Sequence, residues 1–317
     1  MDVVTLGETM VLFTPETPGP MRYTNRYSIR VAGAESNVAI GLSRLGFQAG
    51  WISRLGDDEF GKKIQSFIRG EGVDVSQTIL EADGDTGLFF KEKLAPNEWR
   101  VKYYRKNSAA SMMRPEDVDE SYIASAKFLH VTGITPALSE GCYETVLTAI
   151  EYAKKHHVIV VFDPNLRRKL WPEEKARNVL LELASKADIV LPGIDEAKFL
   201  FGSGTPEQLT ERFRDNGATV VVMKLGSEGA YFWDDDMGGY VAGFSVPEVV
   251  DPVGAGDGFS AGFLSGLLDG LNLHDSVERA NAVGAMVTLV PGDVEGLPEK
   301  GRLMDFMQSR EQGDVER

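Results

Sequence analysis

Short apolar runs rich in β-branched residues alternate along the chain with amphipathic stretches of helical period. The apolar runs are typical of buried strands, and the stretches between them predict helices. Strands are predicted at 3–7, 49–56, 128–134, 158–165, 188–193 and 219–226, and helices at 37–46, 58–71, 139–156, 172–186 and 205–216. This alternation predicts a three-layer α/β fold with a mostly parallel central sheet, in which ligands bind beyond the carboxyl ends of the strands.

Two stretches interrupt this alternation, at about 8–33 and 84–110. Polar and apolar residues alternate there with period two, between turns rich in Pro, Gly and Asn. They predict a small second β-sheet that is inserted into the α/β body as a lid. The chain is expected to form one domain over 1–310, followed by a frayed tail at 311–317.

The composition, with 43% hydrophobic and 26% charged residues, is that of a globular protein with a sizeable core. The single cysteine, Cys142, cannot form an intrachain disulfide, and the four scattered histidines do not indicate a metal cluster. No run approaches the roughly 18 to 20 apolar residues of a membrane helix, and no basic segment precedes the apolar start. We therefore expect a cytoplasmic protein that binds no membrane.

The formal net charge is −15. It argues against general nucleic-acid binding, because phosphate backbones are repelled unless a basic face is segregated from the acidic remainder. No long basic face is visible in the sequence. An anionic small molecule would need local Arg and Lys residues for the same reason, so clusters of these residues are informative.

The stretch DPVGAGDGFSAGF at 251–263 contains the most specific chemical pattern. Apolar residues at helical spacing follow Gly256, so the turn before them is predicted to start a helix. The free N–H groups of Gly254, Ala255 and Gly256 would form an anion hole suited to a phosphoryl group in transfer. Asp257 could then accept the proton of an attacking hydroxyl, although an acid in a first helical turn is also a common cap.

Two glycine-containing stretches match nucleotide loops only in part. GDDEFGKK at 56–63 has Walker A spacing up to Lys62, but Lys63 replaces the Ser or Thr that should bind magnesium, and three acids occupy the loop. It is interpreted as a solvated helix start. GAGDGF has Phe259 in place of the third glycine of a dinucleotide fingerprint, so an oxidoreductase is not favoured.

DPVGAGDGF resembles the D-x-x-G-A-G-D signature of the PfkB family of carbohydrate kinases, which have the ribokinase-like fold. VAGAESNVAIGLSRLG resembles the N-terminal glycine motif of that family, and RLGDDEFG resembles its usual continuation. The likeness covers essentially the whole chain. It implies that Asp257 is the base, that Gly254, Ala255 and Gly256 form the anion hole, and that ATP is the phosphoryl donor.

The resemblance also implies where the nucleotide binds. VVVMKLGSEGAYFW at 220–233 is predicted to form strand, tight turn and strand, and in the family such a K-x-G-x-x-G turn contacts the nucleotide. The resemblance implies nucleotide contacts for Asn165, Lys224, Gly226, Ser227, Gly229, Gly254, Gly256 and Asn281. A plain hairpin would explain the glycines but not Lys224, and an Asn on a helix face, such as Asn281, is more often just solvated.

Magnesium is implied together with ATP, since Mg²⁺ commonly keeps several waters and uses few protein carboxylates. The N-x-x-E motif of the family appears here as GIDE, with Gly193 in the Asn position. Glu196 is retained, and we expect it to organise the water shell of the metal indirectly.

RVKYYRKNSAA, in the predicted lid, indicates the kind of hydroxyl compound that is bound. Val101, Tyr103 and Arg105 share one face of a strand, which would present a phenol and a guanidinium to a cleft below. A guanidinium suits bidentate binding of a carboxylate, which a neutral sugar lacks. Arg167 follows a buried strand and offers a second cation, unless it belongs to a solvated basic patch before the next helix.

This pattern resembles the 2-keto-3-deoxygluconate kinases within the family. The residues implied at the acid sugar are Gly33, Ala34, Tyr103, Arg105, Arg167, Asp257 and Asp293. Asp293 could equally be a turn acid, and Phe89 stands where some of these kinases have a tyrosine. The implied reaction is the ATP-dependent phosphorylation of 2-keto-3-deoxygluconate to 2-keto-3-deoxy-6-phosphogluconate.

Other functions stay open on the sequence alone. One is a sibling kinase for fructose, ribose or another keto-deoxy sugar acid. Another, in a different class, is a sugar sensor that kept the fold and lost catalysis, which the intact Asp257 disfavours because sensing needs no base. The exposed edge of the lid sheet also offers a surface on which a second copy could pair to form a homo-oligomer.

Overall fold

The computed structural model describes residues 1–95, 98–234 and 237–315, with side chains described as far as Gln308. Within these residues a nine-stranded sheet forms the centre, in the order β13-β12-β11-β10-β9-β8-β1-β4-β5. Its strands are β1 (Val3–Leu6), β4 (Ala49–Gly56), β5 (Thr78–Glu81), β8 (Phe128–Thr132), β9 (Ile159–Asp163), β10 (Ile189–Val190), β11 (Val220–Lys224), β12 (Gly229–Trp233) and β13 (Gly238–Ala242). The strands are parallel from β5 to β11, and β12 and β13 add antiparallel strands at one edge.

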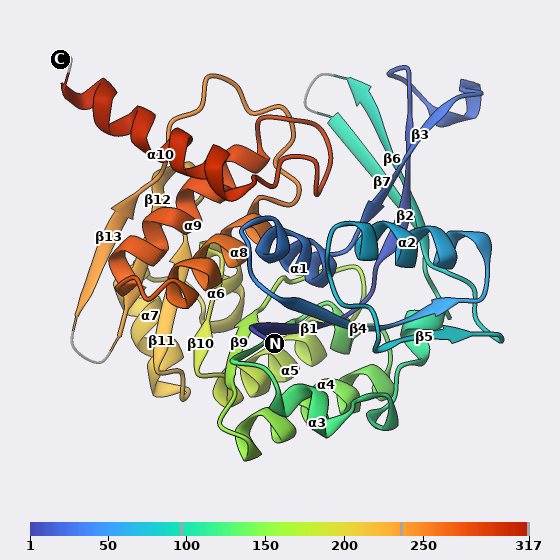
Figure 1. The fold of residues 1–317 in the computed structure, drawn as a ribbon, viewed down its shortest axis with the longest axis horizontal. Helices are drawn as coiled ribbons and strands as arrows, with labels where there is room; N and C mark the ends of the chain where they lie inside the picture. The colour runs from blue at the N-terminus through green and yellow to red at the C-terminus, as the bar shows by residue number, and fades with distance from the viewer. Residues whose placement is uncertain (96–97, 235–236, 316–317) are drawn as a thin grey trace.

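Helices cover both faces of this sheet, as Figure 1 shows. The described helices are α1 (Ala34–Arg44), α2 (Glu59–Gly70), α3 (Glu120–Ala124), α4 (Glu140–Lys155), α5 (Glu173–Lys186), α6 (Ile194–Phe201), α7 (Pro206–Asp215), α8 (Ala255–Leu268), α9 (Leu273–Val287) and α10 (Lys300–Val315). Helices α1, α2, α8 and α9 pack on one face, and α4, α5, α6 and α7 pack on the other.

The strands supply alternate residues to two hydrophobic cores. Val3 and Val222 belong to the core beneath α1, α8 and α9, whereas Val4 and Val221 belong to the core on the opposite face. Successive side chains of a strand point to opposite faces, so a strand covered on both faces must be apolar at consecutive positions. The uninterrupted apolar runs of the sequence therefore follow from this layered arrangement.

A separate four-stranded sheet, in the order β3-β2-β6-β7, projects from the main body (Figure 1). Its strands are β2 (Met10–Pro15), β3 (Tyr27–Ala32), β6 (Leu88–Ala95) and β7 (Glu98–Tyr104). We call it the lid sheet. Because β2 begins only four residues after β1 ends, the lid sheet stands at the carboxyl end of a central strand.

The predicted α/β fold and the separate second sheet are confirmed. Each predicted strand and helix forms, with small shifts at the ends, and Asp58 begins α2 by accepting a hydrogen bond of 2.7 Å from the Gly61 N–H. The structure adds elements that the sequence analysis did not predict, namely β5, β13, α3, α6, α9 and α10. No helix in the described part of the chain is both long and apolar enough to cross a membrane.

The end of the chain differs from the prediction. Helix α10 continues to Val315, so 311–315 is helical where a frayed tail was expected, and 316–317 lies outside the described residues. The polar sequence after Met307 has no apolar stripe of its own. The helix is anchored further upstream, where Leu303 is buried and the ring of Phe306 stacks on Phe244 at 5.4 Å.

Candidate active site

Two cavities in the described part of the chain meet at the amino-terminal end of α8. The first, which we call the α8–α9 cavity, has a volume of about 370 Å³ and lies between the β11–β12 turn and helices α8 and α9. The second, the lid cavity, has a volume of about 550 Å³ and lies between the lid sheet and the carboxyl ends of the central strands. Lys224, Pro252 and Gly256 line both cavities.

The junction is formed by the turn that precedes α8. Gly254 has a φ of +81°, a conformation that glycine adopts at little cost, and a Cβ at this position would lie 2.6 Å from the Asp293 carbonyl oxygen. The helix begins at Ala255, so the N–H groups of its first turn have no partner within the helix. Together with the helix dipole, these groups favour an anion at the junction.

Asp257 lies in the first turn of α8 and faces the lid cavity. The Asn37 Nδ2 donates a hydrogen bond of 2.7 Å to its Oδ2. The pKa of Asp257 is raised to about 7, chiefly by burial and also by the charges of Asp163 and Asp293, against the opposing effects of Asn37 and Arg167. A carboxyl with this pKa can both accept and release a proton near neutral pH.

Lys224 lies at the end of β11 beside the same turn. Its Nζ donates a hydrogen bond of 2.7 Å to the Asp163 Oδ2, and a Cβ built on Gly256 would lie 3.8 Å from this ammonium. Burial alone would lower the pKa of Lys224, but the charges of Asp163 and Glu196 outweigh it and raise the pKa. The lysine therefore stays charged at the point where the two cavities meet.

Glu196 lines the lid cavity near Lys224, and its carboxylate is already engaged with the backbone. One oxygen accepts a hydrogen bond of 2.7 Å from the Gly193 N–H, and the other accepts one of 2.8 Å from the Leu166 N–H. Burial and then the charge of Asp163 raise the pKa of Glu196. Its position fits an organiser of metal-bound water better than a direct ligand, because both oxygens have protein donors.

No three His, Cys, Asp or Glu side chains in the described residues cluster closely enough to hold a metal ion by themselves. Asp163 and Glu196 nevertheless give the lid cavity hard oxygen atoms beside a lysine. Mg²⁺ in phosphoryl-transfer sites usually takes one or two carboxylates, several waters and the substrate phosphates. These residues therefore fit a magnesium ion that arrives with a nucleotide.

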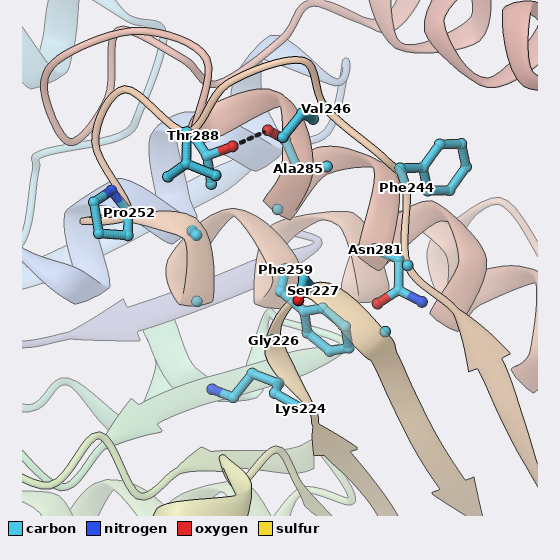
Figure 2. Close-up of a pocket in the computed structure, with 16 residues that line it drawn as sticks. Lys224, Gly226, Ser227, Phe244, Val246, Pro252, Phe259, Asn281, Ala285 and Thr288 are labelled. Carbon is cyan, nitrogen blue, oxygen red and sulfur yellow. Dashed lines mark hydrogen bonds between the residues drawn. The ribbon is translucent and has the colours of Figure 1, made fainter.

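The α8–α9 cavity is mostly apolar (Figure 2). Phe244, Val246 and Phe259 contribute apolar side chains, while Asn281 and Ser227 contribute polar groups. The Asn281 Nδ2 donates to the carbonyl oxygens of Val241 and Ala242, at 3.1 and 3.3 Å, so this amide joins α9 to the end of β13. An apolar slot with few polar groups is suited to a flat aromatic ligand.

The predicted nucleotide residues fall mostly in this cavity. Gly226, Ser227, Gly229 and Asn281 line it, the first two within the short 3₁₀ turn Gly226–Glu228 that joins β11 to β12. Figure 2 shows Lys224 extending from β11 with its ammonium directed away from Asn281. Asn165, by contrast, lines only the lid cavity and not the α8–α9 cavity, so it lies nearer to the predicted sugar residues.

The lid sheet supplies one wall of the lid cavity. Val101, Tyr103 and Arg105 all line it, as their period-two spacing predicts, and Phe89 stacks on Tyr103 at 5.4 Å between ring centroids. The Arg105 side chain is 9% exposed and forms an ion pair with the buried carboxylate of Glu8. The Arg105 Nε has no hydrogen-bond partner in the structure.

The other predicted sugar residues line the lid cavity as well. Gly33 and Ala34 lie where α1 begins, Arg167 is exposed after β9, and Asp293 comes from the segment after α9. Burial raises the pKa of Asp293 to about 6, and its Oδ1 is buried without a hydrogen-bond partner. An unpaired buried oxygen is costly unless a ligand satisfies it, which makes Asp293 a candidate contact.

Four polar residues that line the lid cavity were not singled out from the sequence: Glu8, Asn37, Lys91 and Asp163. Asn37 holds Asp257, Asp163 pairs with Lys224, and Glu8 pairs with Arg105. Glu8 and Asp163 stand at the carboxyl ends of β1 and β9, the positions where parallel sheets collect ligand residues. That positional argument was available from the sequence, whereas the pairing of Asn37 with a residue 220 positions away was not.

Comparisons with known proteins agree with this geometry. The model of the pfkB family carbohydrate kinases matches residues 1–300. The chain is 42% identical to a 2-dehydro-3-deoxygluconokinase of Bacillus subtilis over 98% of its length and 96% of that protein, and 38% identical to one of Thermoproteus tenax over 98% and 95%. It is 33% identical to a 5-dehydro-2-deoxygluconokinase of Bacillus subtilis over 98% and 96%.

Solved structures give the same result at the level of the fold. A PfkB protein from Polaromonas sp. JS666 is 43% identical, with a TM-score of 0.88 over 96% of this chain and 99% of that one. A putative ribokinase II from E. coli, in complex with ATP and Mg²⁺, is 27% identical with a TM-score of 0.90 over 97% and 99%. With the family match over most of its length, the chain belongs to the PfkB family of carbohydrate kinases.

Proposed function

We propose that this kinase transfers the γ-phosphoryl group of ATP to the 6-hydroxyl of 2-keto-3-deoxygluconate, with Asp257 as the base. The observation that carries the proposal is the position of Asp257: it lines the lid cavity in the first turn of α8, next to Gly256, which lines both cavities. The relatives named 2-dehydro-3-deoxygluconokinase support the substrate, since that name describes a kinase for the same keto-deoxy acid.

In the proposed mechanism, Asp257 accepts the proton of the attacking hydroxyl. Asn37 orients the carboxylate through its 2.7 Å hydrogen bond and leaves the other carboxylate oxygen for the substrate. A raised pKa of about 7 gives this base a stronger affinity for the proton than an ordinary aspartate has. A positioned base of this kind contributes typically 10²- to 10⁴-fold to a rate.

The N–H groups at the start of α8 and the Lys224 ammonium stabilise negative charge on the phosphoryl oxygens during transfer. When bound, ATP supplies the phosphoryl group, and Mg²⁺ with its waters neutralises the phosphate charge. Asp163 holds Lys224 at the junction, and Glu196 fixes the backbone of the neighbouring loops. The lid sheet covers the sugar and excludes water as a competing acceptor.

We assign recognition of the sugar carboxylate to Arg105 and Arg167, with Tyr103 beside them. Arg105 is tied to Glu8, which neutralises part of its charge, but its Nε remains free to donate. Arg167 is exposed after β9 and lines the lid cavity, where its guanidinium can reach a ligand. Two guanidinium groups in one cavity favour an anionic sugar over a neutral sugar.

A second candidate substrate is the isomeric keto-deoxy acid. The 33% identical relatives named 5-dehydro-2-deoxygluconokinase support it, because the two acids share a carboxylate and differ in the position of the carbonyl group. The hydrogen bond between Asn37 and Asp257 at the start of α8 speaks against a silent sugar sensor, because sensing needs no oriented carboxylate.

A coupled ATP-consumption assay over a panel of acid and neutral sugars tests the proposal. We expect kcat/KM for 2-keto-3-deoxygluconate to exceed the values for fructose, ribose and the isomeric acid, with the phosphate ester on the 6-position of the product. Faster turnover of fructose or ribose would refute the assignment of the two arginines. Faster turnover of 5-keto-2-deoxygluconate would support a kinase for acid sugars but would show that 2-keto-3-deoxygluconate is not its preferred substrate.

A further inference from the structure

A buried ion pair connects the lid sheet to the turn that forms the anion hole. The Nζ of Lys91, on β6, donates a hydrogen bond of 2.6 Å to the Oδ2 of Asp251, three residues before Gly254. The two residues are 6% and 4% exposed, although they lie 160 positions apart in the chain. Neither the proton transfer nor the binding of the sugar carboxylate uses this pair.

Asp251 joins this lysine to the turn itself. Its Oδ1 accepts a hydrogen bond of 3.2 Å from the Val253 N–H, and its own N–H donates to the Thr288 carbonyl oxygen at 3.3 Å. One oxygen of the Asp251 carboxylate therefore binds the lid sheet through Lys91, and the other binds the backbone of the turn. A movement of Lys91 would be passed to the backbone that leads into Gly254.

The geometry of the ion pair depends on where the lid sheet holds Lys91. The ammonium of Lys91 lies 4.8 Å from the centre of the Trp99 ring of β7, so it is enclosed between a carboxylate and an aromatic face. Removing one member of a buried pair leaves an uncompensated charge, which makes such pairs strict about geometry. The pair thus joins the turn directly to the lid sheet in the structure.

We propose that Lys91 is a positioning residue for phosphoryl transfer: through Asp251 it holds the anion-hole turn in its reactive geometry when the lid sheet covers the sugar. The inference rests on the proposed function, because it assigns a role in that reaction to residues outside the base and the hole. It predicts that loss of the pair slows the transfer step without an equal loss of sugar binding.

A second tie between the lid sheet and this region provides a matched control. Arg30, on β3, pairs with Glu295 at 3.0 Å, but these side chains are 27% and 38% exposed and do not line either cavity. Lys93 is a further control, since it lies two residues after Lys91 on the same strand and is exposed. Neither residue contacts Asp251 in the structure.

The test compares Lys91→Met, Asp251→Asn and the double variant with Arg30→Met and Lys93→Met, in steady-state assays with 2-keto-3-deoxygluconate and ATP. We expect kcat to fall at least about tenfold in Lys91→Met while KM for the sugar changes less than about threefold, since small misplacements at a reacting centre are costly. The double variant should be no slower than the slower single variant, because both changes break one interaction. Both controls should keep kcat within about twofold.

Two further measurements keep the test decisive. The double variant contains no unpaired charge, so its unfolding temperature and its kcat can be compared even where Lys91→Met folds poorly, and Lys91→Arg should recover part of kcat because it keeps the cation. A rise in the sugar KM with unchanged kcat would overturn the proposal, since Lys91 would then be a sugar contact. Multiplicative losses in the double variant, or a wild-type kcat in Lys91→Met, would overturn it as well. Lack of sugar-dependent turnover in the wild type would instead refute the proposed function.

Discussion

Asp257 is surrounded by groups with opposite effects on its charge. Burial, Asp163 and Asp293 disfavour the carboxylate, while the Asn37 amide and Arg167 favour it. The balance raises the pKa of this carboxyl to about 7, well above that of an ordinary aspartate. The same residue that could have been a simple helix cap therefore has the proton affinity of a general base.

The pH dependence of the reaction follows from this pKa. Only the ionised carboxylate can accept a proton, so kcat/KM should rise with pH, level off above about 7 and fall about tenfold per unit below it. A pH–rate profile of the free enzyme checks this. In Asp293→Asn this inflection should move to lower pH, because the charge of Asp293 helps to raise the pKa of Asp257 in the wild type. A rate independent of pH between 5 and 8 would contradict Asp257 as the base.

Arg105 tests the carboxylate assignment. Arg105→Ala should lower kcat/KM for 2-keto-3-deoxygluconate by about 10- to 150-fold, the equivalent of roughly 1.5 to 3 kcal/mol for a charge-assisted hydrogen bond, and should affect fructose less. Lys102→Ala, on the outward face of the same strand, is the control. Because the change leaves Glu8 without its cation, the Glu8→Gln/Arg105→Ala variant should show the same preference with better stability. Equal losses for acid and neutral sugars would mean that Arg105 is structural.

At the scale of elements, the start of α8 concentrates most of the proposed chemistry. The turn places a left-handed glycine, the first N–H groups of the helix and Asp257 within four residues, and the Asp293 backbone packs directly against it. This packing explains why a position in the segment after α9 contributes to a site built around α8. The strong sequence pattern D-x-x-G-A-G-D reflects these steric and electrostatic demands.

Gly254→Ala should therefore impair catalysis, although the substitution adds only a methyl group. A methyl group there meets a carbonyl oxygen at 2.6 Å and requires a positive φ, so the turn must shift; we expect kcat to fall at least about tenfold, with a stability loss of about 1–3 kcal/mol. Gly270→Ala is the matched control, since Gly270 also has a positive φ, of +78°, but nothing lies within 4 Å of the added Cβ. Steady-state kinetics and thermal unfolding of both variants would separate distortion of the hole from general strain. Equal kcat values would contradict a catalytic role for the turn.

At the scale of the whole molecule, the order of the strands assembles the site. The carboxyl ends of β1, β9, β10 and β11 meet at one edge of the main sheet, and the lid sheet stands over that edge (Figure 1). Residues from the first thirty-seven positions thus contact residues beyond position 250. Because of this arrangement, the short turn before α8 borders both cavities.

Much of this was predictable from the sequence. The apolar runs predicted the layered fold, and the period-two lid strand predicted the shared face of Tyr103 and Arg105. The hydrogen-bond partners of the site residues were not predictable. Asn37 and Asp257 are 220 positions apart, and Lys91 and Asp251 are 160 apart, so these pairs depend on how α1 and the lid sheet pack. Helix α10 was not predicted, since it is held by the packing of Leu303 and Phe306 against distant parts of the chain.

The central claim is that phosphoryl transfer occurs at Asp257, where the two cavities meet. Turnover and sugar affinity of Asp257→Asn, measured side by side with the wild type, test it most directly. We expect a loss of about 10²- to 10⁴-fold in kcat, while titration calorimetry still detects binding of 2-keto-3-deoxygluconate, because the arginines and the lid sheet are unchanged. A variant that kept most of its turnover would contradict the account.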